Sequence, residues 1–284
     1  MTRIMVNGLY LNVEIGGTGE PLLLLHGFMG SSQSWAEQRI AFEGSHKVIT
    51  LDLPGHGFSD SPTNPTRYQI DRVSASLDTI LDQLELGSVH LLGYSMGGRV
   101  AQHFALTYPH RVRSLLLEST SPGLADPAER QARIASDAAL AEKIEREGLE
   151  AFVAYWSQLP LFASQANLPA HIRADQWSQR LQNNVGGLAN SLRGLSTGAQ
   201  FPLWDRLNEL TAPTLLIVGA LDSRYTQTGQ QMAKAIPTVQ IAVVPNAGHN
   251  VHLEQPAVFN QLVLDHLKHA SIEPSEDTTK PTRR

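Results

Sequence analysis

The chain has 284 residues, of which 42% are hydrophobic and 17% are charged, and this length suits one large α/β domain with a substantial core. The absence of cysteine excludes disulfide bonds, a cysteine nucleophile and any cysteine-ligated metal or iron–sulfur site. A formal net charge of −5, from 22 Lys and Arg against 27 Asp and Glu, argues against a nucleic-acid-binding surface.

Strand and helix patterns alternate along the first part of the chain. Residues 3–15 are predicted to form two strands around Asn7-Gly8, a dipeptide that is preferred in tight hairpin turns. Helical patterns are present at 70–84 and 97–108. Apolar runs typical of strands that are buried on both faces lie at 21–25, 47–53, 89–93 and 112–118.

A long helical stretch then interrupts this alternation. From about 121 to 206 the sequence has helix-like periodicity, clearest at 129–147, and no convincing strand. Two further strands are predicted at 214–218 and 241–244, each followed by a helix-like stretch. Strands that alternate with helices in this way predict an α/β fold with a mainly parallel central sheet covered by helices.

The predicted elements divide the chain into three parts. Residues 1–120 and 207–270 form the core, and 121–206 form a helical cap inserted after the sixth strand, over the sheet edge where ligands bind in such folds. The plainer alternative for 121–206 is a spacer that packs elsewhere. The polar segment 271–284 is predicted to be a disordered tail. Neither a membrane-spanning run nor a signal peptide is found, so we expect a cytoplasmic protein.

Ser95 lies in a motif typical of a catalytic serine. The segment Gly93-Tyr94-Ser95-Met96-Gly97 has the pattern G-x-S-x-G between a buried strand and a helix, which is the arrangement of a nucleophile elbow. The flanking glycines permit a tight turn that lifts the hydroxyl above the sheet at a helix N-terminus, where the helix dipole favours negative charge. The alternative is that Ser95 only caps the helix.

Two later loops supply a candidate acid and a candidate base. Asp222 follows the strand at 214–218 and His249 follows the strand at 241–244, so the chain order is Ser, Asp, His. Each residue is therefore predicted to lie at the same sheet edge as Ser95. His252 is the chief rival base, although it is predicted to lie inside the next helix.

The loop after the strand at 21–25 is predicted to complete an oxyanion hole. In folds with a nucleophile elbow this loop supplies one backbone N–H and the residue after the serine supplies another, so the donors are Phe28 and Met96. His26 and Asp52, in loops at the same edge, are interpreted as structural residues; the alternatives are that His26 contacts the substrate and that Asp52 replaces Asp222 as the acid. Because the sequence has no metal-ligand cluster and no dinucleotide-binding glycine pattern, we expect neither a metal nor a cofactor.

These motifs together resemble the α/β-hydrolase superfamily over about residues 5–270. Within it, several segments are similar to the 2-succinyl-6-hydroxy-2,4-cyclohexadiene-1-carboxylate (SHCHC) synthases of menaquinone biosynthesis. The similarity in the predicted cap matters most, because caps vary widely within the superfamily. The segments that carry it are 93–101, 118–124, 155–163 and 187–196.

The resemblance implies a lyase rather than a hydrolase. The family eliminates pyruvate from 2-succinyl-5-enolpyruvyl-6-hydroxy-3-cyclohexene-1-carboxylate, because removal of a ring proton leaves a conjugated cyclohexadiene. The serine is implied to act as the base, activated by the histidine, without an acyl-enzyme. The oxyanion hole would then stabilise the charge that develops on the succinyl carbonyl.

The resemblance also implies a set of substrate-binding residues, namely Tyr94, Arg99, Arg133, Trp156 and Arg180. A substrate with three carboxylates needs fixed cations, and arginine binds carboxylates in bidentate geometry. Arg99 lies four positions after Ser95, on the same face of the same predicted helix. Arg130 replaces Arg133 if the helix register differs, and Arg224 is another candidate. For each arginine the alternative is a solvated salt bridge.

Two other functions fit the same motifs. A serine hydrolase, either a carboxylesterase or a carbon–carbon bond hydrolase, uses the same triad and is favoured by an apolar cap pocket. A ligand receptor that retains the hydrolase fold is the third hypothesis. The expected partner is a small-molecule polycarboxylate, without nucleic acid or membrane, bound by a monomer or small homo-oligomer.

Overall fold

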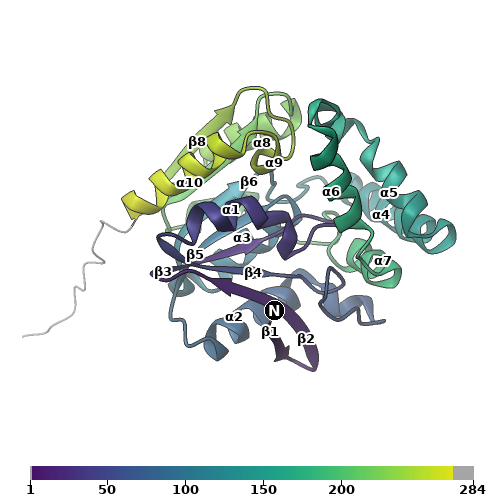
Figure 1. Ribbon diagram of the computed structural model, residues 1–284, viewed down its shortest axis with the longest axis horizontal. Helices are drawn as coiled ribbons and strands as arrows, with labels where there is room; N and C mark the ends of the chain where they lie inside the picture. The colour runs from purple at the N-terminus through teal and green to yellow at the C-terminus, as the bar shows by residue number, and fades with distance from the viewer. Residues whose placement is uncertain (1, 271–284) are drawn as a thin grey trace, which may run out of the picture.

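An eight-stranded sheet forms the centre of the computed structural model, which describes residues 2–270 (Figure 1). The strand order is β1-β2-β4-β3-β5-β6-β7-β8; β1, β2 and β4 pair antiparallel and all other neighbouring strands pair parallel. The mainly parallel sheet is therefore confirmed. The strands are β1 (Thr2–Val6), β2 (Leu9–Gly16), β3 (Glu20–Leu25), β4 (His46–Leu51), β5 (Val89–Tyr94), β6 (Val112–Glu118), β7 (Thr214–Gly219) and β8 (Val239–Val244). The tail predicted at 271–284 lies outside the described residues.

Helices cover both faces of this sheet. The first face packs against α2 (Ile70–Gln83), α3 (Met96–Thr107) and α8 (Ser223–Ala233), and the second against α1 (Ala36–Phe42) and α10 (Pro256–Ala270). Successive strand residues point to opposite faces. In β3, Leu23 and Leu25 accordingly join the first core, whereas Leu22 and Leu24 join the second. An uninterrupted apolar run is what a strand covered on both faces requires.

The segment between β6 and β7 is helical, as the sequence predicts. All of its residues are described, and none of them lies in a strand. Its helices are α4 (Pro127–Glu147), α5 (Leu149–Ser157), α6 (Ala170–Arg180) and α7 (Val185–Gly194), which gather at one end of the sheet (Figure 1). They share an apolar core that includes Ile144, Phe152 and Leu188, together with Met29 from the loop after β3. We call residues 121–206 the helical segment.

Short helices complete the described chain. The single turn α9 (Val251–Glu254) precedes α10, and five 3₁₀ helices lie in loops: η1 (Ser32–Trp35), η2 (Pro65–Tyr68), η3 (Pro109–Arg111), η4 (Pro160–Asn167) and η5 (Trp204–Glu209). Leu203 and Leu207, at either side of the predicted boundary at 206, both pack into the core of the sheet. The chain therefore rejoins the core gradually.

Polar groups determine where one predicted strand ends. The apolar pattern predicts a strand over 47–53, but β4 ends at Leu51. Its successor Asp52 is fully buried and accepts hydrogen bonds from the backbone N–H groups of Ser32 (2.5 Å) and Phe58 (2.8 Å). A carboxylate with these loop partners directs the chain out of the sheet.

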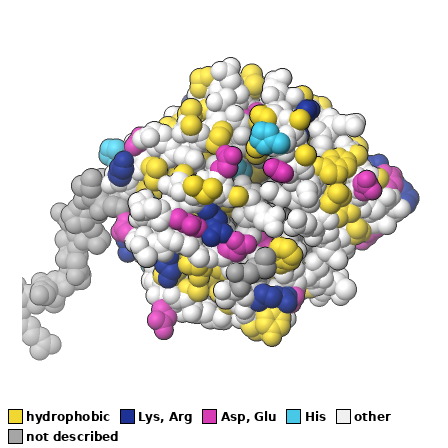
Figure 2. Space-filling view, viewed as in Figure 1, with side chains coloured by type: hydrophobic (Ala, Val, Ile, Leu, Met, Phe, Trp, Pro, Cys, Tyr) yellow, Lys and Arg dark blue, Asp and Glu magenta, His cyan; other side chains and the backbone are white. Residues whose placement is uncertain are grey.

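The surface on the side of α1 and α10 carries Lys, Arg, Asp and Glu side chains interspersed with one another (Figure 2). Intermixed charges of this kind are typical of a solvated face. Among residues 2–270, no helix combines the length and the apolar character that crossing a bilayer would require.

Candidate active site

The backbone at Ser95 is strained, as in a nucleophile elbow. Ser95 lies between β5 and α3 with φ 48° and ψ −105°, in a region that non-glycine residues rarely adopt. A Cβ at Gly93 would lie 2.5 Å from the carbonyl oxygen of Gly97, and one at Gly97 would lie 2.3 Å from that of Leu25. The turn therefore requires both glycines. The Ser95 side chain makes no capping bond to α3, which contradicts the cap-only alternative.

Ser95, His249 and Asp222 form a continuous hydrogen-bonded chain. Nε2 of His249 lies 3.0 Å from Oγ of Ser95, and Nδ1 of His249 lies 2.7 Å from Oδ2 of Asp222. Asp222 and His249 are 7% and 2% exposed, so solvent hardly competes for these bonds. The carboxylate accepts a hydrogen bond from Nδ1–H, which leaves the Nε2 lone pair directed at the serine hydroxyl.

His252, the rival base, has a different partner. It lies in α9, as predicted, and its Nδ1 is 2.6 Å from Oε2 of Glu118. Both side chains are buried, at 2% and 0% exposure. His252 therefore belongs to a second acid–imidazole pair next to the chain that contains Ser95.

The two predicted oxyanion donors line the same cavity as Ser95. Within the described residues, neither the Phe28 nor the Met96 amide donates to an acceptor of the protein. The loop that carries Phe28 is anchored by His26, whose Nε2 accepts a hydrogen bond from the Leu53 amide at 3.0 Å. Burial lowers the pKa of His26 below its usual value, so the ring stays neutral and can accept this bond.

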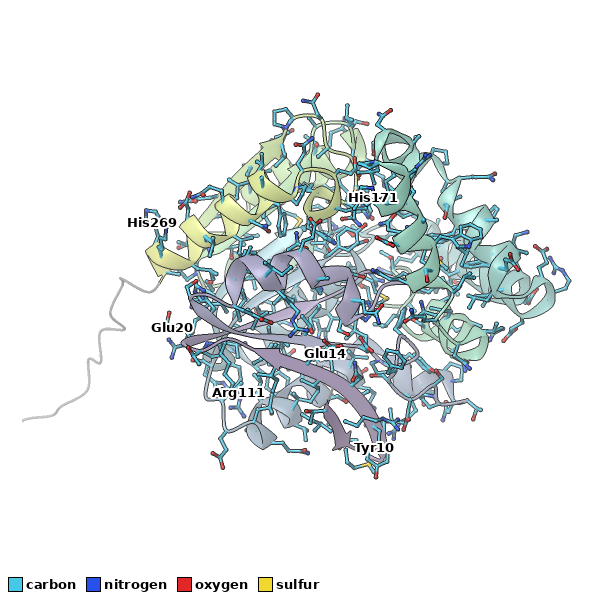
Figure 3. The ribbon with its side chains drawn as sticks, viewed as in Figure 1. Tyr10, Glu14, Glu20, Arg111, His171 and His269 are labelled. Atoms are coloured by element: carbon cyan, nitrogen blue, oxygen red, sulfur yellow. The ribbon has the colours of Figure 1, made fainter. Side chains whose placement is uncertain are left out.

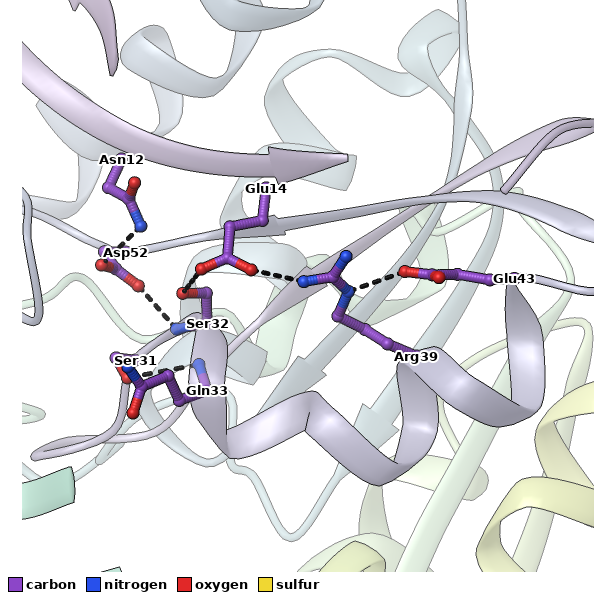
Figure 4. Close-up of polar contacts among 8 residues, drawn as sticks. All are labelled: Asn12, Glu14, Ser31, Ser32, Gln33, Arg39, Glu43 and Asp52. Carbon is purple, nitrogen blue, oxygen red and sulfur yellow. Dashed lines mark hydrogen bonds and ion pairs between the residues drawn. The ribbon is translucent and has the colours of Figure 1, made fainter. Parts of the chain in front are cut away.

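A buried polar network supports this loop from the side of the sheet (Figure 4). Asp52 accepts hydrogen bonds from the Ser32 amide and from Nδ2 of Asn12 in β2 (2.9 Å). Glu14, also in β2, accepts from Oγ of Ser32 at 3.2 Å and pairs with Arg39 of α1. The interpretation of Asp52 as structural agrees with this placement, because its carboxylate joins loops and makes no contact with His249.

Ser95 opens into a cavity of about 190 Å³, which we call the serine cavity. It lies between the carboxyl ends of the strands and the helical segment, so this segment covers the sheet edge. Its charged lining comprises Arg99, Arg133 and Arg224 against one carboxylate, Asp137, besides His249 of the hydrogen-bonded chain. The lining is therefore cationic. A wider cavity outside it, of about 420 Å³, also contains Arg133 and Arg224.

Arg99 is a buried cation without a carboxylate partner among the described residues. It is 8% exposed and donates to Oε1 of Gln200 (2.6 Å) and to the carbonyl oxygen of Leu195 (2.7 Å). Burial, and then the nearby positive charge of Arg133, lower the pKa of Arg99 to about 10. At neutral pH the guanidinium still carries its charge, so an anion in the serine cavity would be attracted to it.

The other predicted arginines lie in different surroundings. Nε of Arg133 is bonded to both carboxylate oxygens of Asp137, at 2.8 and 2.9 Å, and Arg133 lines the serine cavity. Arg130, the alternative, donates to the carbonyl oxygen of Ala125 and is absent from that lining. Arg180 lines a neighbouring cavity of about 180 Å³, the side cavity, where it donates to Oγ of Ser157 at 2.7 Å.

Aromatic side chains separate the serine cavity from the side cavity. Both cavities are lined by Phe28, Tyr94, Trp156 and Phe162. Trp156 packs edge-on against Phe28 with ring centroids 5.0 Å apart, and Arg180 lies over the ring of Phe162. Burial, and then Glu118, raise the pKa of Tyr94 well above its usual value, so its phenol keeps its proton. Tyr94 and Trp156 therefore border both the serine cavity and the side cavity, whereas Arg180 lines the side cavity alone of these two.

Sequence reasoning missed three residues of this site. Glu118 was visible as a carboxylate that ends an otherwise apolar strand, which is a signal for a buried partner. Asp137 was visible four positions after Arg133, the spacing of a helical ion pair. Gln200, the partner of Arg99, comes from a loop 101 residues away, and no sequence pattern points to it.

Comparison with known proteins agrees with this geometry. The family model of the alpha/beta hydrolase fold matches residues 20–256. A Bacillus subtilis (strain 168) protein provisionally named as an SHCHC synthase is 49% identical over 87% of this chain and 90% of its own length. The SHCHC synthase of Klebsiella pneumoniae subsp. pneumoniae is 35% identical over 86% of this chain and 93% of its own.

A solved structure, that of MenH from S. aureus, superimposes with a TM-score of 0.87 and 36% identity over 92% of this chain and 98% of the other. The similarity thus includes the helical segment as well as the sheet. The elbow, the hydrogen-bonded chain and these relatives lead to one conclusion. The chain belongs to the α/β-hydrolase fold family and, within it, to the family of SHCHC synthases.

Proposed function

We propose that this protein is a carbon–oxygen lyase that converts 2-succinyl-5-enolpyruvyl-6-hydroxy-3-cyclohexene-1-carboxylate into SHCHC and pyruvate. The observation that carries the proposal is the combination of Ser95–His249–Asp222 with a cationic cavity. Three arginines and one carboxylate line the serine cavity, which suits a polyanion better than a neutral ester. The relatives named as SHCHC synthases support the same reaction.

The chemistry begins with a proton transfer. Oγ of Ser95 takes a proton from the ring carbon next to the succinyl carbonyl as its own proton passes to Nε2 of His249, 3.0 Å away. Asp222 stabilises the resulting imidazolium through its 2.7 Å contact with Nδ1. The electron pair of the broken C–H bond moves toward the carbonyl, and the amides of Phe28 and Met96 stabilise the developing oxyanion.

The second half of the reaction expels the leaving group. The electron pair returns to form a double bond between ring carbons 2 and 3, the original double bond between carbons 3 and 4 shifts to carbons 4 and 5, and the C–O bond from carbon 5 to the enolpyruvyl group breaks. Pyruvate leaves as its enolate and takes up one proton, for which protonated His249 is the source. Atoms and charge balance without an oxidant, a metal or an acyl-enzyme.

The carboxylates of the substrate account for the arginines. Arg99 has no carboxylate partner among the described residues, and an anion beside it offsets the cost of its burial. Arg133 is already paired with Asp137 through Nε, which leaves the other guanidinium nitrogens for a ligand. We propose that Tyr94, Trp156 and Arg180 bind the part of the substrate that reaches the aromatic boundary with the side cavity. We also propose a cytoplasmic location, which suits a chain that has no cysteine.

An assay of released pyruvate tests the reaction directly. Purified protein given the enolpyruvyl substrate should release one pyruvate for each substrate consumed, while a parallel panel of p-nitrophenyl esters measures hydrolysis. Stoichiometric pyruvate with slow ester turnover is the expected result. Rapid ester turnover with a serine-bound acyl group, and no pyruvate, would instead establish the hydrolase.

A further inference from the structure

Glu118, the last residue of β6, contacts Ser95 and the turn that follows His249, although the mechanism above assigns it no role. It is 1% exposed. Its backbone carbonyl accepts the Ser95 N–H at 2.9 Å. Its carboxylate accepts the His252 N–H through Oε1 at 3.0 Å and contacts Nδ1 of His252 through Oε2 at 2.6 Å. One buried residue is therefore bonded to the serine and to the turn that follows His249.

The bond to Ser95 holds a strained backbone in place. Ser95 has φ 48°, and such a conformation persists only where the surroundings fix it. The Glu118 carbonyl binds the amide of this residue from the neighbouring strand. The position of the serine hydroxyl is thus defined relative to β6.

The carboxylate defines the position of the imidazole relative to the same strand. Two bonds fix both the backbone and the ring of His252, three residues after His249. Two other hydrogen bonds hold this loop. The carboxylate of Glu254 accepts one from the Gly248 amide (2.8 Å), and the carbonyl oxygen of Ala247 accepts one from the Leu221 amide, which follows β7 (2.9 Å). Glu118 links this loop to β6, the strand that also binds the Ser95 amide.

Ring packing extends this connection to the substrate side. The His252 ring lies 4.3 Å from Trp35, at an interplanar angle of 32°, and meets Tyr94 edge-on at 5.0 Å. Tyr94 in turn packs against His249, with centroids 5.5 Å apart. The paired His252 ring therefore supports the tyrosine that lies beside the reacting imidazole.

We propose that Glu118, acting through His252, is a positioning residue that sets the distance between Oγ of Ser95 and Nε2 of His249. The effect on pyruvate release rests on the proposed function, whereas the effect on serine reactivity does not. Small displacements of reacting groups are costly, since a shift of about 1 Å can reduce the rate about 100-fold. Glu118 touches no substrate in this proposal and acts only through geometry.

The test compares Glu118→Gln with the wild type in two assays. The variant keeps the side-chain volume but replaces one of the two carboxylate oxygens, each of which faces one nitrogen of His252, with an NH₂ group. We expect kcat for pyruvate release to fall about 10- to 100-fold with KM within about twofold. The second-order rate of Ser95 phosphonylation by a fluorophosphonate should fall by a similar factor. Glu20→Gln is the matched control, because Glu20 pairs with His90 at the opposite end of the sheet.

A second pair of variants separates positioning from loss of folding. His252→Gln alone should slow phosphonylation, and the double variant Glu118→Gln/His252→Gln should recover part of the rate because two amides can bond to each other. Rates are divided by the folded fraction measured by near-UV circular dichroism. Unchanged phosphonylation per folded molecule in both single variants overturns the proposal, as does an absence of recovery in the double variant. If the wild type reacts with the probe but releases no pyruvate, only the proposed function fails.

Discussion

The sheet edge and the helical segment contribute to the site in different ways. Ser95, Asp222 and His249 come from loops at the ends of strands, where backbone and buried hydrogen bonds fix them. The helical segment contributes long side chains such as Arg133, whose side chain is 39% exposed and is held by Asp137 on the same helix. Positions set by strand topology are defined before any ligand binds, whereas those of arginine side chains depend on local helix packing. The first region places the reacting groups, whereas the arginines that meet substrate charge come from both: Arg99 on α3 and Arg224 on α8 from the first, and Arg133 on α4 from the second.

The largest effect is expected from the sheet edge. Ser95→Ala removes the proposed base and should lower kcat for pyruvate release roughly 10²- to 10⁴-fold, the usual contribution of general-base catalysis. The hydroxyl makes no capping bond to α3, so the melting temperature should change little. Steady-state pyruvate release and differential scanning calorimetry measure the two quantities. A variant that keeps the wild-type rate would remove Ser95 from the mechanism.

Arg99 tests the contact between the two regions, because it lies on α3 but donates hydrogen bonds to Gln200 and Leu195 in the helical segment. Arg99→Met should lower kcat/KM about 10- to 150-fold, which corresponds to the loss of about 1.5–3 kcal/mol from a charged hydrogen bond. Arg206→Met is the control, since the Arg206 side chain is partly exposed and paired with Glu209. Equal kcat/KM values for the two variants would contradict the role of Arg99.

Mild acid should destabilise the sheet region through its buried histidines. Burial lowers the pKa of His56 from 6.5 to about 3 and that of His266 to about 4. Below pH 6.5 the unfolded chain binds protons that the folded chain does not. Neither ring lowers the free energy of unfolding above pH 6.5. As the pH decreases from 6.5 toward the pKa in the folded chain, each ring lowers it by up to about 1.4 kcal/mol per pH unit. The helical segment has one histidine, His171, exposed on α6 (Figure 3).

Urea unfolding at several pH values between 7 and 5 measures how the free energy of unfolding depends on pH. Amide hydrogen exchange at the same pH values shows whether the sheet region or the helical segment loses protection first. His56→Gln should make the stability less dependent on pH. Loss of protection that begins in α4–α7 at acid pH would show that the sheet region is not the acid-sensitive part.

The smallest effect is expected within the helical segment. Arg193 on α7 forms two hydrogen bonds of 2.7 Å with Glu145 on α4, and both side chains are partly exposed, at 30% and 42%. Solvent screens such pairs, so Glu145→Gln should cost at most about 1 kcal/mol of unfolding free energy. Thermal unfolding at low salt and in 1 M NaCl measures it. A difference that persists in high salt would show that the pair acts through packing instead of charge.

The two regions also differ in how well sequence predicts them. Apolar runs located the strands, and G-x-S-x-G followed by later Asp and His loops located the residues that the structure brings together, because parallel strands end at one edge. The predicted end of β4 was wrong, because hydrophobic periodicity does not reveal the hydrogen bonds that a buried carboxylate such as Asp52 accepts. Helical periodicity located α4 but could not show that Arg180 borders the side cavity, since this depends on how helices pack over one another.

The buried charge of Arg99 has a consequence for identifying ligands. Burial of the Arg99 guanidinium costs unfolding free energy, and an anion that binds beside it offsets part of this cost. Ligand binding and stability are then thermodynamically linked. An anionic ligand should raise the melting temperature by an amount that depends on the ratio of its concentration to its Kd. Heating the protein with a series of mono-, di- and tricarboxylic acids would therefore rank ligand classes even before the authentic substrate is synthesised.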